Sequence, residues 1–418
     1  MIAVTKYFKS GLIQNTFFLF LNKGINVIVP IIIIPLCHKL FGIESYGEWV
    51  YVQSMLFVFV LIFDYGFNLS APRAISTSKN NLLNIQNIYS SILIFKFVLS
   101  ILIGVLLVGY LLFTKSSLLL LFVFTYMSLS LQSLIPYWFF QGMQENKYIS
   151  YINLFSKIFI FFPFLFLNAA SLKIYHIPLF ETFAYLITLL VALLFIKKEY
   201  KCRIKKINYL AIVKQLKEGN NIFITSLISW LIVSGSVIVV EHYATKFELG
   251  YFATFTRIGY YMYALFQPIN HAIFPYVAVK FAESKKNGLN FLKKIELLYF
   301  GIVALIISSI ILLNKLMFKL FLGSSFMIGY DSYTWVFIII CFWIGLLLIN
   351  NFLGIQYLLG DKKDKVYRNF CIVNGIIFLV GIITLTPNYH SLGAAISMCT
   401  GEFMFFLLYL VKVKSIKN

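Results

Sequence analysis

The chain alternates long apolar runs with short polar segments, and the lengths of these runs predict membrane helices. A run of roughly 20 apolar residues is long enough to cross a hydrocarbon core of about 30 Å. The runs cover residues 12–36, 46–67, 88–113, 118–141, 148–167, 177–196, 221–243, 250–275, 291–313, 333–359, 366–385 and 392–411. The pattern predicts an all-α integral membrane protein with about twelve transmembrane helices.

The composition agrees with this class and gives no sign of an enzyme. Of 418 residues, 61% are hydrophobic and 12% are charged, and the mean hydropathy is +0.88. The sequence contains no glycine-rich phosphate loop, no HExxH and no GxSxG motif. The five cysteines have no paired spacing, so neither a disulfide framework nor a metal site is expected. We predict a protein that is not an enzyme and has no cofactor.

The basic residues predict the orientation of the chain in the membrane. The formal net charge is +20, with 35 lysines and arginines. About 25 of them lie in alternate loops or at the termini on one side, against about six on the other side, as the positive-inside rule requires. Nucleic-acid binding is therefore not expected, and both termini are predicted to be cytoplasmic.

Residues from the first half of the chain return in the second half at a constant offset. Gly47 corresponds to Gly250, and Pro72 corresponds to Pro275, in each case 203 positions later. Because each copy holds an even number of predicted spans, the copies are parallel, and transporters built in this way bind substrate between their two halves.

The repeat predicts two parallel six-helix lobes around a central cavity. The N-lobe covers residues 1–197 and the C-lobe covers residues 218–418. Residues 198–217 form a basic cytoplasmic linker that joins the lobes, and its charge is expected to rest on anionic headgroups.

Four cations lie inside predicted spans, where an ionised side chain is costly and usually functional. They are Lys23, Lys96, Lys157 and Arg257. A cavity lined by such groups would bind an anionic headgroup, and phosphate is the group that ammonium and guanidinium both bind well. The alternative is that the long side chains reach an interface and leave the charge in water.

Two carboxylates and one further cation are candidates for gating or ion coupling. Asp64 lies just inside one edge of its span, and Arg73 follows in the polar loop. Glu402 lies midway along the last span, where it could take up a proton or pair with a buried cation. A coupling ion, H⁺ or Na⁺, is therefore an expectation.

Four segments carry a resemblance to a known family. They are NTFFLFLNKGINVIVPIIIIPLCHKLFGIESYG (15–47), FDYGFNLSAPRAIS (63–76), PYWFFQGMQENKYIS (136–150) and GYFATFTRIGYYMYALFQPINHAIFP (250–275). Together they resemble the polysaccharide transporters of the MOP superfamily, and the Wzx-type O-antigen flippases most of all.

The resemblance implies a function and a set of partners. It implies alternating access in a bacterial inner membrane, with an undecaprenyl-pyrophosphate-linked oligosaccharide moved from the cytoplasmic to the periplasmic leaflet. Other glycan-assembly membrane proteins are expected partners. By position, Lys23, Lys96, Lys157 and Arg257 would meet the pyrophosphate or acidic sugars, and Asp64 and Arg73 would belong to a gate.

Two other functions remain open on the sequence. A multidrug cation antiporter of the same superfamily would need an acid-rich cavity, and the balance of charges inside the spans is the reverse. A membrane-embedded glycan polymerase or ligase would usually need a sizeable outer loop, whereas the longest segment between predicted spans is cytoplasmic.

Overall fold

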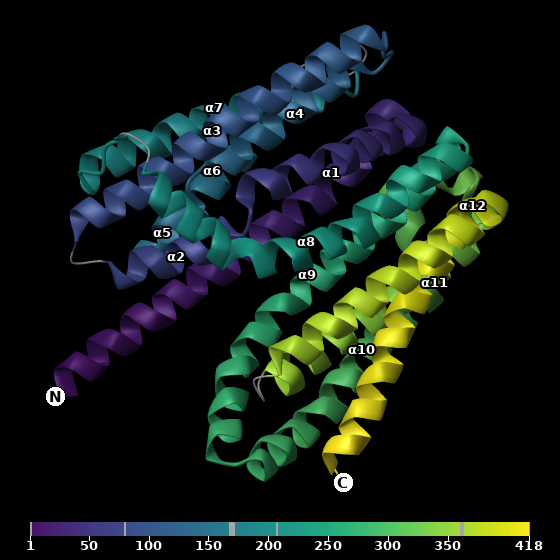
Figure 1. Cartoon of the computed structure of the whole chain (residues 1–418). Coiled ribbons are helices and arrows are strands. Elements are labelled where there is room, and N and C mark those ends of the chain that lie inside the picture. The colour runs from purple at the N-terminus through teal and green to yellow at the C-terminus, as the bar shows by residue number, and fades with distance from the viewer. Residues whose placement is uncertain (1, 79–80, 167–171, 206–207, 360–362, 418) are drawn as a thin grey trace. The chain divides into compact units, whose positions relative to one another are not determined.

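The computed structural model describes residues 2–78, 81–166, 172–205, 208–359 and 363–417, and within these ranges the regular elements are helices (Figure 1). The first seven are α1 (Ile2–Asp64), α2 (Phe67–Thr77), α3 (Leu82–Phe113), α4 (Leu119–Leu134), α5 (Tyr137–Met143), α6 (Asn146–Phe166) and α7 (His176–Glu199). They are followed by α8 (Tyr209–Tyr243), α9 (Lys246–Glu283), α10 (Lys285–Leu322), α11 (Tyr330–Phe352) and α12 (Asp364–Lys417). A 3₁₀ turn (Phe326–Ile328) precedes α11, and a π-helical stretch (Leu353–Leu359) follows it.

The prediction of an all-α integral membrane protein is confirmed. Among the described residues, eight helical stretches are long and apolar enough to cross a membrane. The stretch 365–412 contains two predicted spans, and the stretch 24–77 contains the span 46–67 and the second half of the span 12–36. The predicted spans 148–167 and 250–275 are not among those stretches but coincide with α6 and α9.

Three interruptions divide the helices, and one of them falls inside a predicted span. α1 bends at Gly42 (φ 79°), between its two predicted spans, and α12 breaks at His390 (φ 50°). The predicted span 118–141 is interrupted between α4 and α5, because Ile135 is extended and Pro136 has no backbone N–H to continue the helix.

The contacts along the chain form two compact units, which we describe separately. Unit 1 comprises Met1–Val29 and Val52–Leu227, and unit 2 comprises Pro30–Tyr51 and Ile228–Asn418. The segment Pro30–Tyr51, which the repeat assigns to the N-lobe, packs within unit 2. The boundaries of the lobes and linker stay a prediction.

In unit 1, helices α3, α4, α6 and α7 run side by side, and the short helices α2 and α5 pack against each other (Figure 1). Gly142 makes the second contact close, because a Cβ at this position would lie 2.8 Å from the Cβ of Ile75 on α2. Trp138 and Phe139 of α5 are fully buried. The WFFQG and FDYGFNLSAPRAIS segments therefore belong to one packing core.

The basic linker is not a free tether where it is described, because its backbone is bound to α3 in unit 1. Gln86 Nε2 donates to the carbonyl of Lys201 (2.9 Å), and Ser90 Oγ donates to that of Arg203 (3.2 Å). The backbone N–H of Asn208 donates to Ser91 Oγ (2.8 Å). We call residues 200–208 the strap, leaving aside 206–207, which lie outside the described ranges.

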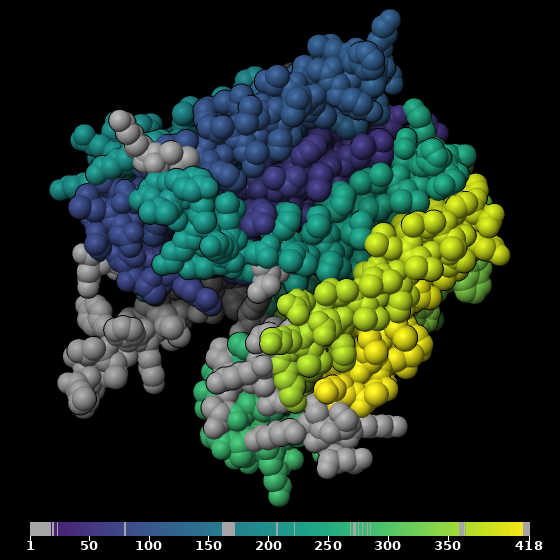
Figure 2. All heavy atoms as spheres, in the orientation of Figure 1, coloured from purple at the N-terminus to yellow at the C-terminus, as the bar shows by residue number. Residues whose placement is uncertain are grey.

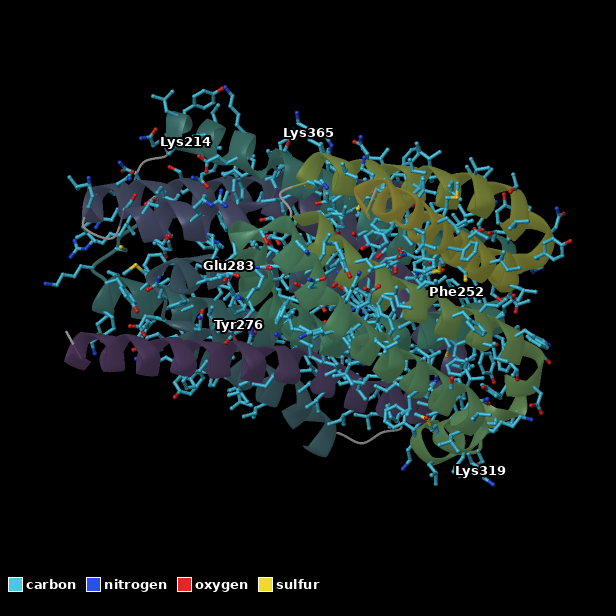
Figure 3. All side chains as sticks on the ribbon, turned by 90° about the horizontal axis from the view of Figure 1, so that it is seen from below. Lys214, Phe252, Tyr276, Glu283, Lys319 and Lys365 are labelled. Atoms are coloured by element: carbon cyan, nitrogen blue, oxygen red, sulfur yellow. The ribbon has the colours of Figure 1, made fainter. Side chains whose placement is uncertain are left out.

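In unit 2, His390 divides α12 into two arms, one before it and one after it in the sequence. The two arms pack side by side (Figure 2). A Cβ at Gly381 would lie 3.0 Å from Ser397 Oγ of the other arm, so a small residue permits the close approach. Figure 3 shows the length of α9 in the same unit, with Phe252 near its beginning and Tyr276 and Glu283 near its end.

Candidate functional site

The end of α1 in unit 1 holds a buried ion pair. Lys96 of α3 places its Nζ 2.6 Å from Asp64 Oδ1, with side-chain exposures of 1% for Lys96 and 21% for Asp64. The ammonium also donates to the carbonyl of Ser133 (3.0 Å). Asp64 accepts from Ser133 Oγ (2.9 Å) and from Asn68 Nδ2 (2.8 Å). The charge of each partner is thus compensated inside a helix bundle, where an isolated charge would be costly.

Helix α1 ends directly after Asp64, and the backbone at this end packs against Gly219 of α8. Tyr65 and Gly66 have positive φ angles of 34° and 80°, which end α1. A Cβ on Gly66 would lie 2.6 Å from the carbonyl oxygen of Gly219. The Tyr65 ring stacks on Phe223 at 4.4 Å, and its hydroxyl donates to Asn220 Oδ1 (3.3 Å). This packing fixes the Asp64 carboxylate at the junction of α1 and α2.

Polar side chains of α1 and α6 meet in unit 1, and we call the row formed by Ser150, Asn153 and Lys157 on α6 the polar stripe. Asn153 of α6 donates through Nδ2 to Asn22 Oδ1 of α1, and Ser150 Oγ donates to the carbonyl of Phe18 (2.6 Å). Lys157, one turn beyond Asn153, is half-buried, and its Nζ lies 3.2 Å from Tyr185 Oη of α7. The side chain of Lys23, next to Asn22, lies outside the described part of the structure.

In unit 2, Arg257 is half-buried on α9 and lies within electrostatic range of Tyr46 and Tyr260. The neighbouring turn of α9 is tied to the segment Pro30–Tyr51, because His38 Nε2 and Thr254 Oγ1 lie 3.0 Å apart. Arg257 is therefore a cation inside a helix bundle, in aromatic surroundings.

Glu402 is buried in unit 2 between two asparagine amides. Asn350 Nδ2 donates to Oε2 (2.7 Å), and Asn374 Nδ2 donates to Oε1 (2.8 Å). The side-chain oxygens of both asparagines are buried and have no hydrogen-bond partner among the described residues. A buried carboxylate with two amide oxygens that can still accept provides hard oxygen groups for a proton or a small monovalent cation.

A second group of amides lies on α9 and at the end of α11. Asn270 Nδ2 donates to Asn351 Oδ1 (2.6 Å), and Asn351 Nδ2 donates to Tyr263 Oη (2.8 Å). Gln356, in the π-helical stretch, donates to the carbonyl of Asn270 (2.8 Å). Asn270 Oδ1 and Gln356 Oε1 are also buried and lack a partner among the described residues.

The structure brings together some of the predicted site residues and separates others. It joins Asp64 to Lys96 and places Lys157 on the polar stripe in unit 1, whereas Arg257 and Glu402 belong to unit 2. Arg73 is exposed on α2. Neither snorkelling nor a free ammonium describes Lys96, because its charge is bound to Asp64.

Sequence reasoning missed the partners that hold the charged groups. Ser133 and Asn68 complete the surroundings of Asp64, and Asn350 and Asn374 those of Glu402. The asparagines could have been found as amides inside otherwise apolar spans. Across the described ranges, no three His, Cys, Asp or Glu residues gather as metal ligands would.

The sequence matches one protein family over most of its length. Residues 12–280 match the sequence model of a family described as "Polysaccharide biosynthesis protein". Among curated proteins, the chain is 24% identical over 413 residues to a "Putative O-antigen transporter" of Escherichia coli (strain K12), with 98% of each chain covered. A protein of the same name from Shigella dysenteriae is 23% identical over 411 residues, covering 96% of this chain and all of the other.

The fold is similar to that of solved MOP-superfamily transporters. An inward-facing multidrug resistance MATE family transporter matches with a TM-score of 0.70 over 94% of this chain and 99% of the other, at 12% identity. A MOP superfamily transporter from Pyrococcus furiosus, described as having a binding pocket of reverse polarity, matches with a TM-score of 0.60 over 98% of this chain and 97% of the other, also at 12% identity. At this identity the likeness concerns the fold alone.

Proposed function

Because the chain belongs to the polysaccharide biosynthesis protein family, we propose that it transports an undecaprenyl-pyrophosphate-linked O-antigen or other polysaccharide repeat unit. Transport would run from the cytoplasmic to the periplasmic leaflet of a bacterial inner membrane, by alternating access, with both termini cytoplasmic. The observation that carries the proposal is the full-length match to proteins named as O-antigen transporters. These names favour a transporter over a glycan polymerase or ligase.

The proposal assigns the pyrophosphate to cations that lie inside the helix bundles. Lys157 and Arg257 are half-buried, and ammonium and guanidinium groups both donate strong hydrogen bonds to phosphate oxygens. Lys23 would join them, because its neighbour Asn22 contacts the polar stripe that leads to Lys157. The polyprenyl tail would remain in the bilayer.

The Asp64–Lys96 pair is assigned to the gate rather than to the substrate, with Arg73 on the adjoining helix α2. Its two charges already satisfy each other, so Lys96 would reach a phosphate only after the pair had opened. The same pairing weakens the multidrug-antiporter alternative, because it removes Asp64 as a free acid for a cationic drug.

Glu402 is the group through which transport would be coupled to an ion. In support, its carboxylate is buried, and the described residues around it are amides rather than cations. A proton or Na⁺ could therefore neutralise it without displacing a resident counter-ion.

The lipid-linked substrate can be tested in cells that lack this protein. A membrane lipid extract should contain complete single repeat units on polyprenyl pyrophosphate, identified by mass, and the surface polymer should be lost. Accumulation of polymerised or incomplete glycan would contradict the proposal and place the protein at another step of assembly. Unchanged glycan with altered drug tolerance would favour the antiporter.

The assigned cations can be tested in the same cells. Lys157→Ala and Arg257→Ala should each abolish surface glycan at a normal protein level, whereas Lys157→Arg should keep part of it because the charge remains. Lys319→Ala, which removes an exposed lysine in the last turn of α10, is the matched control and should have no effect. Full activity of both alanine variants would overturn the assignment of these cations.

A further inference from the structure

Helices α6 and α7 run side by side in unit 1 (Figure 1), and a groove of about 240 Å³ lies between them. Its walls are aromatic, with Tyr148, Tyr151 and Phe155 from α6 and Phe195 from α7. Its floor is formed by two small residues of α7, Thr188 and Ala192, both only 1% exposed. A narrow floor between bulky walls gives the groove its depth.

The groove offers hydrocarbon surface and very little polarity. The hydroxyl of Thr188 donates to the carbonyl of Ala184 on its own helix (2.6 Å), so it is not free for a ligand. Tyr148 and Phe195 pack against each other with their ring centroids 4.6 Å apart. Tyr151 is 54% exposed and Phe155 is 37% exposed. In a bilayer such a surface is covered by hydrocarbon chains rather than by water.

One end of the groove carries cations, and the other face of α6 carries the polar stripe. Lys147 lies beside Tyr148, with its Nζ 4.9 Å from the ring centroid, and Lys197 and Lys198 follow Phe195 in the last turn of α7. The acids at this end are Glu145, which pairs with Lys147 at 3.2 Å, and Glu199. Three cations against two acids leave an excess of positive charge beside an apolar groove.

We propose that this groove binds a segment of the polyprenyl tail of the lipid-linked substrate, with the pyrophosphate at the lysine end. The inference rests on the proposed function and adds a docking position for the tail. An anionic head attached to a long hydrocarbon complements both the charge at one end and the apolar walls. α6 would then contact the substrate on both faces, with the tail against Tyr151 and the head later reaching Lys157 on the polar stripe.

The test uses the full-length protein in nanodiscs of phosphatidylethanolamine and phosphatidylglycerol. Undecaprenyl pyrophosphate with a diazirine in its tail should label peptides of α6 and α7, and unlabelled undecaprenyl pyrophosphate should compete. Ala192→Phe, which fills the floor, should reduce this labelling about tenfold, because the contact with several methylene groups is lost. Tyr151→Ala removes a wall that is more than half exposed, together with its ring contact with Phe18 of α1, and should also reduce the labelling.

The matched controls lie on the same helices outside the groove. Leu190→Phe and Leu154→Ala change side chains that are 52% and 45% exposed, and both should leave the labelling unchanged. A second probe is phosphatidylglycerol with a diazirine in its acyl chain. If it labelled the same peptides equally, and unlabelled undecaprenyl pyrophosphate did not compete, the groove would be an ordinary lipid site and the proposal would be overturned. Competed labelling at other helices would overturn the groove but leave the proposed function intact. No competed labelling anywhere would count against both.

Discussion

Gly47 and Gly250, which the sequence repeat pairs at an offset of 203 positions, lie directly against each other in unit 2. A Cβ added to Gly47 would lie 2.8 Å from the backbone nitrogen of Gly250, and a Cβ on Gly250 would overlap the carbonyl oxygen of Ile43. When two copies of a unit are related by a two-fold axis, a residue that touches its own equivalent lies near that axis. The repeat therefore predicts that its two copies meet at this contact.

Adding a methyl group at this contact should destabilise the protein. Gly47→Ala and Gly250→Ala each force backbone to move, and overpacking of this kind typically costs about 1–3 kcal/mol. The measurement is the thermal unfolding midpoint of the purified protein in detergent, which should fall. Gly301→Ala is the control, because a Cβ there meets nothing within 4 Å and alanine favours the helix. Unchanged midpoints for both contact variants would show that the backbones are not in contact.

The hydrophobic pattern was sufficient to predict the helical class, and within the described residues the predicted spans fall on helices, apart from the break at Pro136. The length of an apolar run decides whether it can cross the bilayer, and this length can be read directly from the sequence. The interruption at Pro136 and the joining of two spans across Gly42 were not predicted, because both depend on local backbone geometry rather than on hydrophobicity.

The partners of the charged residues could not be predicted in the same way. Sequence position gives the depth of Lys96 and Asp64 in the bilayer but not the direction in which each side chain points around its helix. Their pairing is a property of packing between α1 and α3, and it gives the Asp64 carboxylate a counter-ion that the sequence did not show. The roles assigned to Lys23, Lys157, Arg257, Arg73 and Glu402 stay predictions.

The Asp64–Lys96 pair should respond asymmetrically to mutation. Asp64→Asn leaves an ammonium that is only 1% exposed, whereas Lys96→Met leaves a carboxylate that is 21% exposed and still bound by Ser133 and Asn68. Removing one partner of a buried pair costs up to about 3–5 kcal/mol, so Asp64→Asn should lower the unfolding midpoint more than Lys96→Met. The double variant should recover part of the loss.

The control for this cycle is an exposed pair in unit 2. Asp331→Asn breaks the bridge between Lys315 and Asp331, whose side chains are 64% and 77% exposed, and should leave the midpoint nearly unchanged. If Asp64→Asn and Lys96→Met behaved like this control, the pair would not be buried and the gate assigned to it would lose its basis.

The strap should protect a cysteine from chemical labelling. Cys202 is 2% exposed, and burial raises the pKa of its thiol, so less of the reactive thiolate is present at neutral pH. In a variant whose other four cysteines are replaced by serine, a maleimide should label Cys202 slowly in native membranes and rapidly after denaturation. Introducing Lys201→Cys in place of Cys202 should restore fast labelling, because Lys201 is exposed. Equal rates at both positions would mean that residues 200–208 are a free tether.

Glu402 provides the sharpest test of ion coupling, because its surroundings tolerate the neutral amide. In Glu402→Gln one new amide would face an asparagine Nδ2, but Asn350 and Asn374 each carry a side-chain oxygen that lacks a partner among the described residues and can turn to accept. We therefore expect a normal protein level and unfolding midpoint, together with loss of the response to a pH gradient in proteoliposomes that contain the lipid-linked substrate.

Glu296→Gln is the matched control, since this carboxylate of unit 2 accepts a hydrogen bond from Tyr357 (2.5 Å) and is assigned no coupling role. A Glu402→Gln variant that responds to the gradient as the unmodified protein does would remove this carboxylate from the mechanism. If a Na⁺ gradient drove the unmodified protein but not the variant, the same oxygen groups would be assigned to Na⁺ instead of a proton.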